Sequence, residues 1–313
     1  MENLKSIVTT EPLLDHENGF FKRLCQTDGE LSFTMSGRCG IYQCLEDIKQ
    51  KDQKRVAYLP MYTCETVAAP FQKAGYTLRF YEVDENLRSI FDDAVINEIS
   101  VLSLCGYYGF CNYDHEFVKE CHERGVVIFE DMTHSLLCRD GMVPLCDYAA
   151  GSFRKWMDVA SDGFAMKRRG KFEIGCQKPH QEHLALRRQY IDTHSMDAFW
   201  DAEMMLRQIF DLYAVPKTLK GLRPVFPALT ENAVPSHFCF YAEEREHFLA
   251  YLKEHNIFYK VFWPVGPLVN VEGHDTVKYV YGHIVSLFCD QHCGREYMLK
   301  LARIIAEYPG VTV

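Results

Sequence analysis

The chain has 313 residues, of which 48% are hydrophobic and 25% charged, and this composition excludes a mainly disordered or collagen-like protein. Its formal net charge of -9 offers no general attraction to a phosphate backbone and argues against nucleic-acid binding. No apolar run reaches the roughly 18 residues that span a bilayer, and charges stand where a signal peptide needs an apolar stretch. We therefore expect a cytoplasmic protein with no membrane partner.

The cysteines are numerous but scattered. Thirteen of them lie between Cys25 and Cys293, mostly within apolar segments. No Cys-x-x-Cys pair occurs, and the cluster at 289–293 lacks a second pair of ligands at zinc spacing. Small buried thiols in a reducing compartment are the favoured interpretation, and no metal is expected.

From about residue 36 to 165, helical periodicity alternates with short β-rich runs, the pattern of a parallel sheet covered by helices. The Val126 to Phe129 run is almost wholly apolar, which is typical of a strand buried on both faces. Strand and helix are expected to alternate strictly in the first part of this region. The expected elements are a helix at 40–50, a strand at 55–59, a helix capped by Thr63 and running through 74, strands at 77–83 and 101–105, a helix at 114–124, and strands at 126–129 and 148–153.

The pattern changes after about residue 178 to a long helical stretch through Tyr213, followed by a proline-containing connector. A smaller unit then carries an expected strand at 237–241, an amphipathic helix at 243–255 and a last helix at about 295–308. The sequence thus predicts a large α/β domain over residues 1–215 and a smaller α+β domain over 216–313. Residues 1–30 are a candidate for packing on the small domain.

Residues that directly follow strands are the candidates for function, because open α/β sheets bind ligands beyond the carboxyl ends of their strands. The stretch SGRCG at 36–40 precedes a helix, and its backbone N–H groups and Arg38 suit a phosphate, although a plain helix cap is the commoner role. Asp131, within FEDMTH, ends an apolar strand. A buried carboxylate there can bind a metal, orient a histidine or pair with a protonated ring nitrogen, and the alternative is a helix N-cap.

Two further segments follow strands. Lys155, in GSFRK, can act as an amine nucleophile toward a carbonyl if it is held near a carboxylate and an anion site, whereas most lysines simply face solvent. Tyr107 and Tyr108, in GYYG, form an aromatic pair at another strand end. Arg168 and Arg169 can supply positive charge to an anionic substrate, but solvated surface charges are the favoured interpretation.

The order of these segments resembles the DegT/DnrJ/StrS family of aminotransferases. The resembling segments of the large domain are SGRCGIYQCL, VAYLPMYTCETV, GYYGF, FEDMTH, GSFRK and DGFA. The second unit continues the resemblance with PSHFCFYAEEREHFLAYLKEHNI, FWPV and VSLFCDQHCGREYMLKLARII, so that it covers about residues 30–308. The resemblance implies the pyridoxal-phosphate-dependent transferase fold of type I, a mostly parallel sheet between helices with a smaller α+β C-terminal domain.

Each site residue has a role that the resemblance implies. Lys155 is the Schiff-base lysine, and Asp131 is the partner of the pyridinium nitrogen of pyridoxal phosphate. His134 lies beside a cofactor oxygen, and Tyr108 and Arg154 are substrate contacts. The remaining implied cofactor contacts, four at the phosphate and one at the ring, are Gly37, Arg38, Cys39, Ser152 and Cys64.

The chain departs from the family pattern at three places. Cys64 stands where an aromatic ring often stacks on the cofactor, Gly106 stands where many relatives have histidine, and the loop after Ser152 is short. The resemblance implies a homodimeric aminotransferase that moves an amino group, from a donor such as glutamate, to a keto group of a sugar or nucleotide-linked sugar.

Two alternatives stay open. One is a pyridoxal-phosphate-binding or regulatory protein of the same fold, and the other is a different pyridoxal-phosphate reaction such as racemisation or dehydration. Lys155 argues against the dehydratases of this family, which have histidine at that position.

Overall fold

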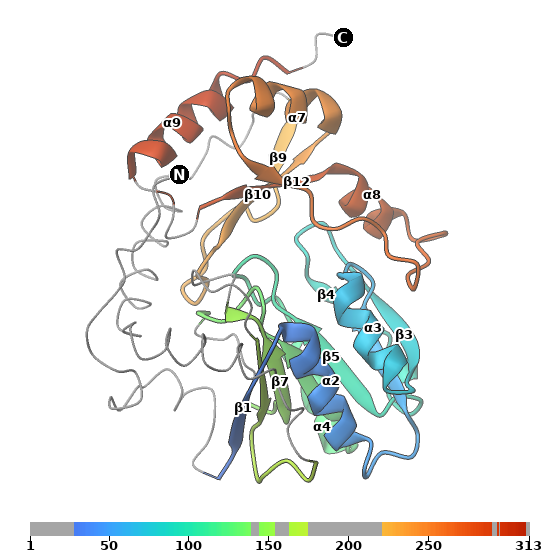
Figure 1. Cartoon of the computed structure of the whole chain (residues 1–313). Helices are drawn as coiled ribbons and strands as arrows, with labels where there is room; N and C mark the ends of the chain where they lie inside the picture. Colours follow the sequence, from blue (N-terminus) through green and yellow to red (C-terminus); the bar gives the residue numbers. More distant parts are fainter. Residues whose placement is uncertain are drawn as a thin grey trace, which may run out of the picture.

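The computed structural model of the chain describes residues 28–138, 144–153, 163–174, 221–289, 293 and 295–310. Within these residues, an eight-stranded sheet forms the large domain and a four-stranded sheet forms the smaller one (Figure 1). The expected helical stretch at 178–213, the domain boundary at 215 and residues 1–27 lie outside the described residues. None of the described helices is both long and apolar enough to cross a membrane.

The large sheet has the strand order β1-β8-β7-β6-β5-β2-β3-β4. Its strands are β1 (Glu30–Thr34), β2 (Val56–Pro60), β3 (Thr77–Val83), β4 (Ser89–Ile90), β5 (Val101–Cys105), β6 (Val127–Asp131), β7 (Tyr148–Gly151) and β8 (Gly163–Lys167). The strands from β7 to β3 run parallel to one another, as predicted. At the margins, β4 pairs antiparallel with β3, β8 with β7, and β1 with β8.

The expected alternation in the first part of this region is confirmed, since helix, strand, helix and strand follow one another between residues 37 and 83. Beyond it, β4 follows β3 without a helix, because an antiparallel neighbour needs no crossover helix. The strands β3 and β5 have the expected bounds, whereas β6 begins and ends later than expected and therefore includes Asp131 as its last residue.

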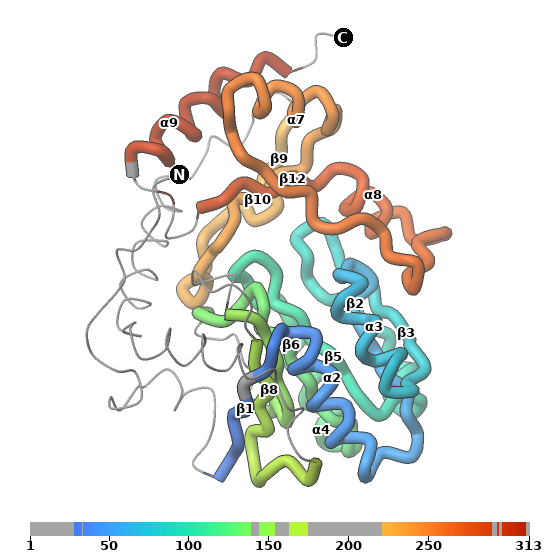
Figure 2. Tube along the Cα trace, in the orientation of Figure 1, coloured from blue at the N-terminus to red at the C-terminus, as the bar shows by residue number. Residues whose placement is uncertain are grey.

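Two helices, α2 (Gly37–Ile48) and α3 (Glu65–Lys73), cover one face of the large sheet, and α4 (His115–Glu123) covers the other (Figures 1 and 2). The predicted apolar face of α2 is buried, and Ser36 caps this helix by accepting a hydrogen bond from the backbone N–H of Cys39 (3.4 Å). A short 3₁₀ helix, η3 (Asp93–Val95), precedes β5.

The N-cap of α3 is Cys64, so the expectation that Thr63 caps this helix is wrong. Thr63 is buried, and its backbone N–H donates to the hydroxyl of Tyr281 (3.1 Å) in the small domain. This contact joins residues 218 positions apart in the chain, so local sequence pattern gave no sign of it.

The small sheet has the order β11-β12-β10-β9 and is packed against helices (Figure 2). Its elements are β9 (Leu222–Pro224), β10 (His237–Ala242), α7 (Arg245–Glu254), β11 (Tyr259–Lys260), α8 (Asp275–His283), β12 (Ile284–Phe288) and α9 (Arg295–Ala306). A single apolar cluster runs from the α4 face of the large sheet into this domain. The hydroxyl of Tyr281 also donates to the backbone oxygen of Met61 (2.9 Å), which fastens α8 to the loop after β2.

Candidate active site

Three neighbouring parallel strands end side by side at the carboxyl edge of the large sheet. Cys105 of β5 pairs with Asp131 of β6, and Asp131 pairs with Ala150 of β7. The backbone N–H of Met132 donates to the oxygen of Ala150 (2.8 Å), so the chain after β6 stays close to the end of β7. The predicted residues Asp131 and Ser152 therefore leave the sheet at the same edge.

Asp131 is a buried acid, with 3% of its surface exposed. Its Oδ1 accepts a hydrogen bond from the backbone N–H of Thr133 (3.0 Å). Burial raises the pKa of Asp131, and the hydrogen bonds from Thr133 only partly oppose this. In the described part of the chain, no Lys, Arg or His side chain forms an ion pair with this carboxylate. A protonated ring nitrogen would fit this position, because a buried carboxylate needs a positive partner.

The start of α2 lies against the end of β7. A Cβ atom on Gly37 would lie 3.3 Å from the carbonyl of Gly151 and 3.6 Å from Cβ of Ser152. The side chain of Ser152 is therefore next to the first turn of a helix, where backbone N–H groups and the helix dipole favour an anion. Cys39 is in the same turn, with its Sγ 3.3 Å from Oγ of Ser36, and Arg38 is exposed there. This arrangement fits the phosphate of a cofactor whose ring reaches toward Asp131.

Cys64 and Tyr108, two other predicted site residues, follow β2 and β5. Cys64 is partly buried, and its Sγ lies 3.0 Å from Oγ1 of Thr66. Tyr108 is fully buried, and its hydroxyl lies 2.9 Å from that of Tyr62. Burial raises the pKa of Tyr108 well above its usual value, so this phenol stays neutral.

His134 is buried and is surrounded by rings, several of which belong to the small domain. Its ring lies 5.5 Å from that of Tyr108 and 6.0 Å from that of His237, with the two imidazoles nearly parallel at 11°. Phe262 and Trp263 lie 5.5 and 5.6 Å from it. Sequence reasoning placed His237, Phe262 and Trp263 in segments that resemble the family but gave them no role in the site, because they are about a hundred residues or more from His134 in the chain.

Two predicted residues, Lys155 and Arg154, lie outside the described residues, and their assignments stay predictions. The described chain stops at Phe153, two positions before Lys155, and resumes at Gly163 at the start of β8. Arg168 and Arg169 follow the other end of β8, where the backbone N–H of Arg168 donates to the oxygen of Asp147 (2.9 Å). They therefore lie at the amino edge of the sheet, away from Asp131.

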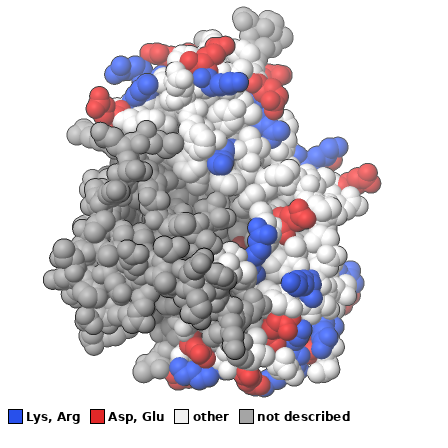
Figure 3. All heavy atoms as spheres, in the orientation of Figure 1, with Lys and Arg blue, Asp and Glu red and all other residues white. Residues whose placement is uncertain are grey.

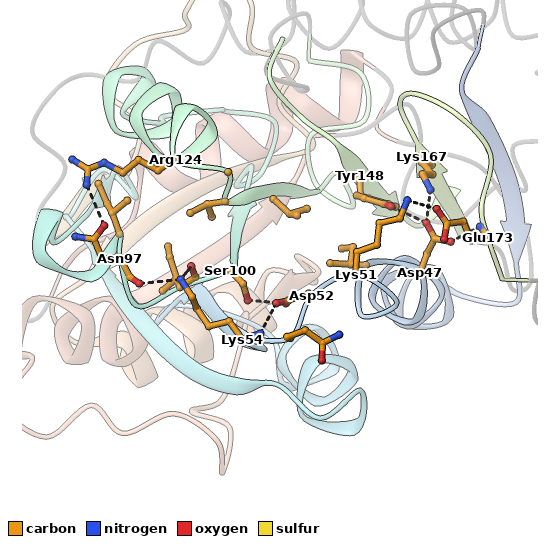
Figure 4. Close-up of a pocket in the computed structure, with 17 residues that line it drawn as sticks. Asp47, Lys51, Asp52, Lys54, Asn97, Ser100, Arg124, Tyr148, Lys167 and Glu173 are labelled. Carbon is orange, nitrogen blue, oxygen red and sulfur yellow. Dashed lines mark hydrogen bonds and ion pairs between the residues drawn. The ribbon is translucent and has the colours of Figure 1, made fainter.

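A cavity of about 480 Å³ lies at this amino edge, opposite to the predicted site (Figure 4). Its charged side chains bind one another or the backbone: Lys51 pairs with Glu173, and Lys54 donates to the oxygen of Asn97 (2.9 Å). On the face seen in Figure 3, Lys and Arg lie interspersed with Asp and Glu at the top and at the lower right. Because its charges are already paired, we assign no ligand to this cavity.

Asp47 is the buried acid that lines this cavity, and its side chain is 1% exposed. It accepts hydrogen bonds from Nζ of Lys167 (2.7 Å), the hydroxyl of Tyr148 (2.7 Å) and the backbone N–H of Glu173 (2.5 Å) (Figure 4). Burial acts to raise the pKa of Asp47, but the bonds from Lys167, Tyr148 and Glu173 outweigh it and lower the pKa. The carboxylate therefore ties α2 to β7, β8 and the segment that follows.

We expect Asp47→Asn to lower the free energy of unfolding at pH 7 by about 3 kcal/mol, because Lys167 would lose its buried partner. Since the folded-state pKa is lowered, the carboxylate stabilises the fold above its unfolded pKa of about 4, and this stabilisation is lost as the pH falls through the folded-state value. Urea unfolding at pH 7 and at lower pH measures both effects. Glu46→Gln, which breaks the more exposed Glu46 to Lys49 pair, is the control and should cost under about 1 kcal/mol. Equal losses for the two variants would contradict this role of Asp47.

No protein-family model matches the chain, and no curated protein sequence matches it either. Solved structures do match it: the chain has the fold of type I pyridoxal-phosphate-dependent aminotransferases, as the sequence predicted. DesV of S. venezuelae, in complex with a ketimine intermediate, is 17% identical with a TM-score of 0.76, and the alignment covers 94% of this chain and 89% of DesV.

Two other solved structures match over most of their length. A putative sugar aminotransferase from Streptococcus pneumoniae, in its PMP form, is 13% identical with a TM-score of 0.74, covering 96% of this chain and 90% of that one. Helicobacter pylori PseC, an aminotransferase involved in the biosynthesis of pseudoaminic acid, is 14% identical with a TM-score of 0.67, covering 95% and 91%. At these identities the likeness establishes the fold.

Proposed function

We propose that this chain is a pyridoxal-phosphate-dependent aminotransferase that moves an amino group from an amino acid such as glutamate to a keto group of a sugar or nucleotide-linked sugar. The observation that carries this proposal is the position of Asp131. This buried acid lies one strand from Ser152 and the start of α2, at the carboxyl edge of a fold that sugar aminotransferases also have.

Each predicted site residue has a separate role in this proposed reaction. Pyridoxal phosphate, when bound, supplies an electron sink for the bond that breaks at the α-carbon of the amino acid. Asp131 holds the proton on the ring nitrogen, and Ser152 and the first turn of α2 bind the phosphate. Lys155 holds the cofactor and moves the proton at the α-carbon, and His134 lies beside a cofactor oxygen. Cys64 borders the ring, and Tyr108 and Arg154 belong to the substrate side of the site.

The setting of the reaction is also part of this proposal. The cysteines are scattered along the chain, and most of those in the described part are buried. Such cysteines are typical of a reducing compartment, and we place the protein in the cytoplasm. We further propose that it acts as a homodimer on two small molecules in turn, the amino donor and the keto sugar.

Transfer of the amino group can be measured directly. The protein, purified with pyridoxal phosphate, should convert L-glutamate to 2-oxoglutarate in an amount equal to the sites present when no acceptor is added. D-Glutamate is the control and should give none. If no common L-amino acid yields its oxo acid, the aminotransferase assignment fails and a binding or regulatory protein is favoured. If an L-amino acid is instead converted to its D form and keeps its amino group, the reaction is racemisation.

A further inference from the structure

Thr133 supplies two hydrogen bonds to the carboxylate of Asp131. The backbone N–H of Thr133 donates to Oδ1 of Asp131 (3.0 Å), and the hydroxyl of Thr133 also bonds to this carboxylate. Of the two bonds, the one from the hydroxyl lowers the pKa of Asp131 more. The predicted site does not include Thr133, so its contact with the central acid of the site is a finding of the structure.

The backbone that carries Thr133 is anchored to the sheet. Met132, the residue before it, is buried, and its N–H donates to the oxygen of Ala150 on β7 (2.8 Å). The oxygen of Met132 accepts a hydrogen bond from the N–H of Ser135 (3.1 Å). A Cβ atom on Gly151 would lie only 3.3 Å from the backbone carbonyl carbon of Met132, so the turn packs closely against the end of β7. The donors of Thr133 therefore belong to a turn that the sheet holds in place.

The partners of Asp131 on the two adjoining strands contribute no charge. Cys105, opposite it on β5, stays a neutral thiol because burial raises its pKa well above the usual value. Ala150, opposite it on β7, has no titratable group. Glu130 and His134 are close to Asp131 in the chain, but neither is among the groups that shift the pKa of Asp131. Within the described residues, burial and the bonds from Thr133 therefore act against each other on this carboxyl.

Burial and the proposed reaction make opposite demands on Asp131. Burial favours the neutral acid, whereas only the ionised form can keep a proton on a ring nitrogen. A hydrogen bond to an ionised group is about twice as strong as one between neutral groups, so a donor that faces the carboxylate favours its charged form. The hydroxyl of Thr133 is such a donor.

We propose that Thr133 is a positioning residue for Asp131, which it holds in place and in its ionised form. This inference rests on the proposed function, in which the ionised carboxylate holds the proton on the ring nitrogen of pyridoxal phosphate. Two substitutions separate the hydroxyl from the rest of the residue. Thr133→Val removes the hydroxyl but keeps the backbone N–H and a β-branched side chain, whereas Thr133→Ser keeps both donors.

The titration of Asp131 in the cofactor-free protein tests the contact without turnover. Carbon-13 NMR of protein labelled at the aspartate carboxyl groups follows the titration, and the signal that disappears in Asp131→Asn identifies this residue. In Thr133→Val the midpoint should rise by about one pH unit, which is what one hydrogen bond to a charged group is worth, and in Thr133→Ser it should stay near the wild-type value.

Thr66→Val is the matched control for this titration. Thr66 follows β2 at the same edge of the sheet, and its hydroxyl lies 3.0 Å from Sγ of Cys64. Its substitution should leave the midpoint of Asp131 unchanged.

The rate of 2-oxoglutarate formation from saturating glutamate gives a second readout with pyridoxal phosphate bound. Thr133→Val should lower the single-turnover rate about tenfold with a smaller change in the KM for glutamate, and Thr133→Ser should keep most of the rate. When Asp131→Asn is already present, Thr133→Val should cause little further loss, because the ionised carboxylate that it supports is gone.

Three results would overturn the proposal. These are an unchanged midpoint in Thr133→Val, an equal rise of the midpoint in Thr66→Val, or a loss of rate in Thr133→Val that is the same with and without Asp131→Asn. Thermal melting shows whether each variant keeps its fold, and Thr133→Ala replaces the valine variant if that one is unstable. A failure of the proposed function looks different, because no amino acid would then yield its oxo acid while Thr133→Val would still move the titration of Asp131.

Discussion

Lys155→Ala should lower the rate of amino transfer from glutamate by about 10⁴-fold, the largest loss that we expect from any single substitution. The lysine amine is assigned two tasks: it holds the cofactor covalently, and it moves the proton at the α-carbon, and positioned proton transfer alone is worth about 10² to 10⁴ in rate. Formation of 2-oxoglutarate in a single turnover measures the loss.

Two controls accompany this variant. Lys119→Ala removes an exposed lysine of α4 and should leave the rate unchanged. An added small amine such as ethylamine should restore part of the activity of Lys155→Ala, because it can carry the missing proton. If Lys155→Ala keeps a tenth or more of the wild-type rate, this lysine does not have the assigned role.

Asp131→Asn should lower turnover by about 10² to 10³-fold while the protein still binds pyridoxal phosphate. The amide cannot hold a positive charge on the ring nitrogen, so the electrostatic support for charge that develops in the transition state is lost. Cofactor binding followed by absorbance, together with the rate of 2-oxoglutarate formation, separates binding from turnover.

The stability of the cofactor-free protein tests the burial of Asp131 independently of turnover. Burial raises the pKa of Asp131, so ionisation of this carboxyl destabilises the folded chain as the pH rises from the unfolded value of about 4 through the folded one. Asp131→Asn without cofactor should thus be at least as stable as the wild type at pH 7.

Asp147→Asn is the matched control, because burial also raises the pKa of this acid and it lies at the amino edge, where it accepts a hydrogen bond from Ile128. It should leave turnover unchanged. Retained turnover in Asp131→Asn, or an equal loss of turnover in Asp147→Asn, would show that Asp131 does not hold the proton on the ring nitrogen.

Local sequence pattern predicted the parallel part of the large sheet and the edge at which the site residues gather. The apolar run before Asp131 is a strand buried on both faces, and a capping serine with a repeating apolar face produces α2. The marginal strands β1 and β8 escaped the prediction, because they pair antiparallel and lie outside the alternation of strand and helix that marked the other strands. The rings packed around His134 escaped it because the small domain supplies His237, Phe262 and Trp263.

The departure from the family at Gly106 has a packing reason that only the structure reveals. A Cβ atom on this residue would lie 2.4 Å from Cβ of Ser135, so the present arrangement leaves no room for a side chain at this position. A histidine at position 106 would therefore require Ser135 to move.

The most direct test of the central claim is a crystal structure of the protein with pyridoxal phosphate. The account predicts that the ring nitrogen lies within hydrogen-bond distance of the Asp131 carboxylate, that the phosphate lies against Ser152 and the first turn of α2, and that the cofactor is bonded to Nζ of Lys155. A cofactor bound elsewhere, for instance in the cavity beside Asp47, or Asp131 and Lys155 pointing into separate pockets, would contradict it.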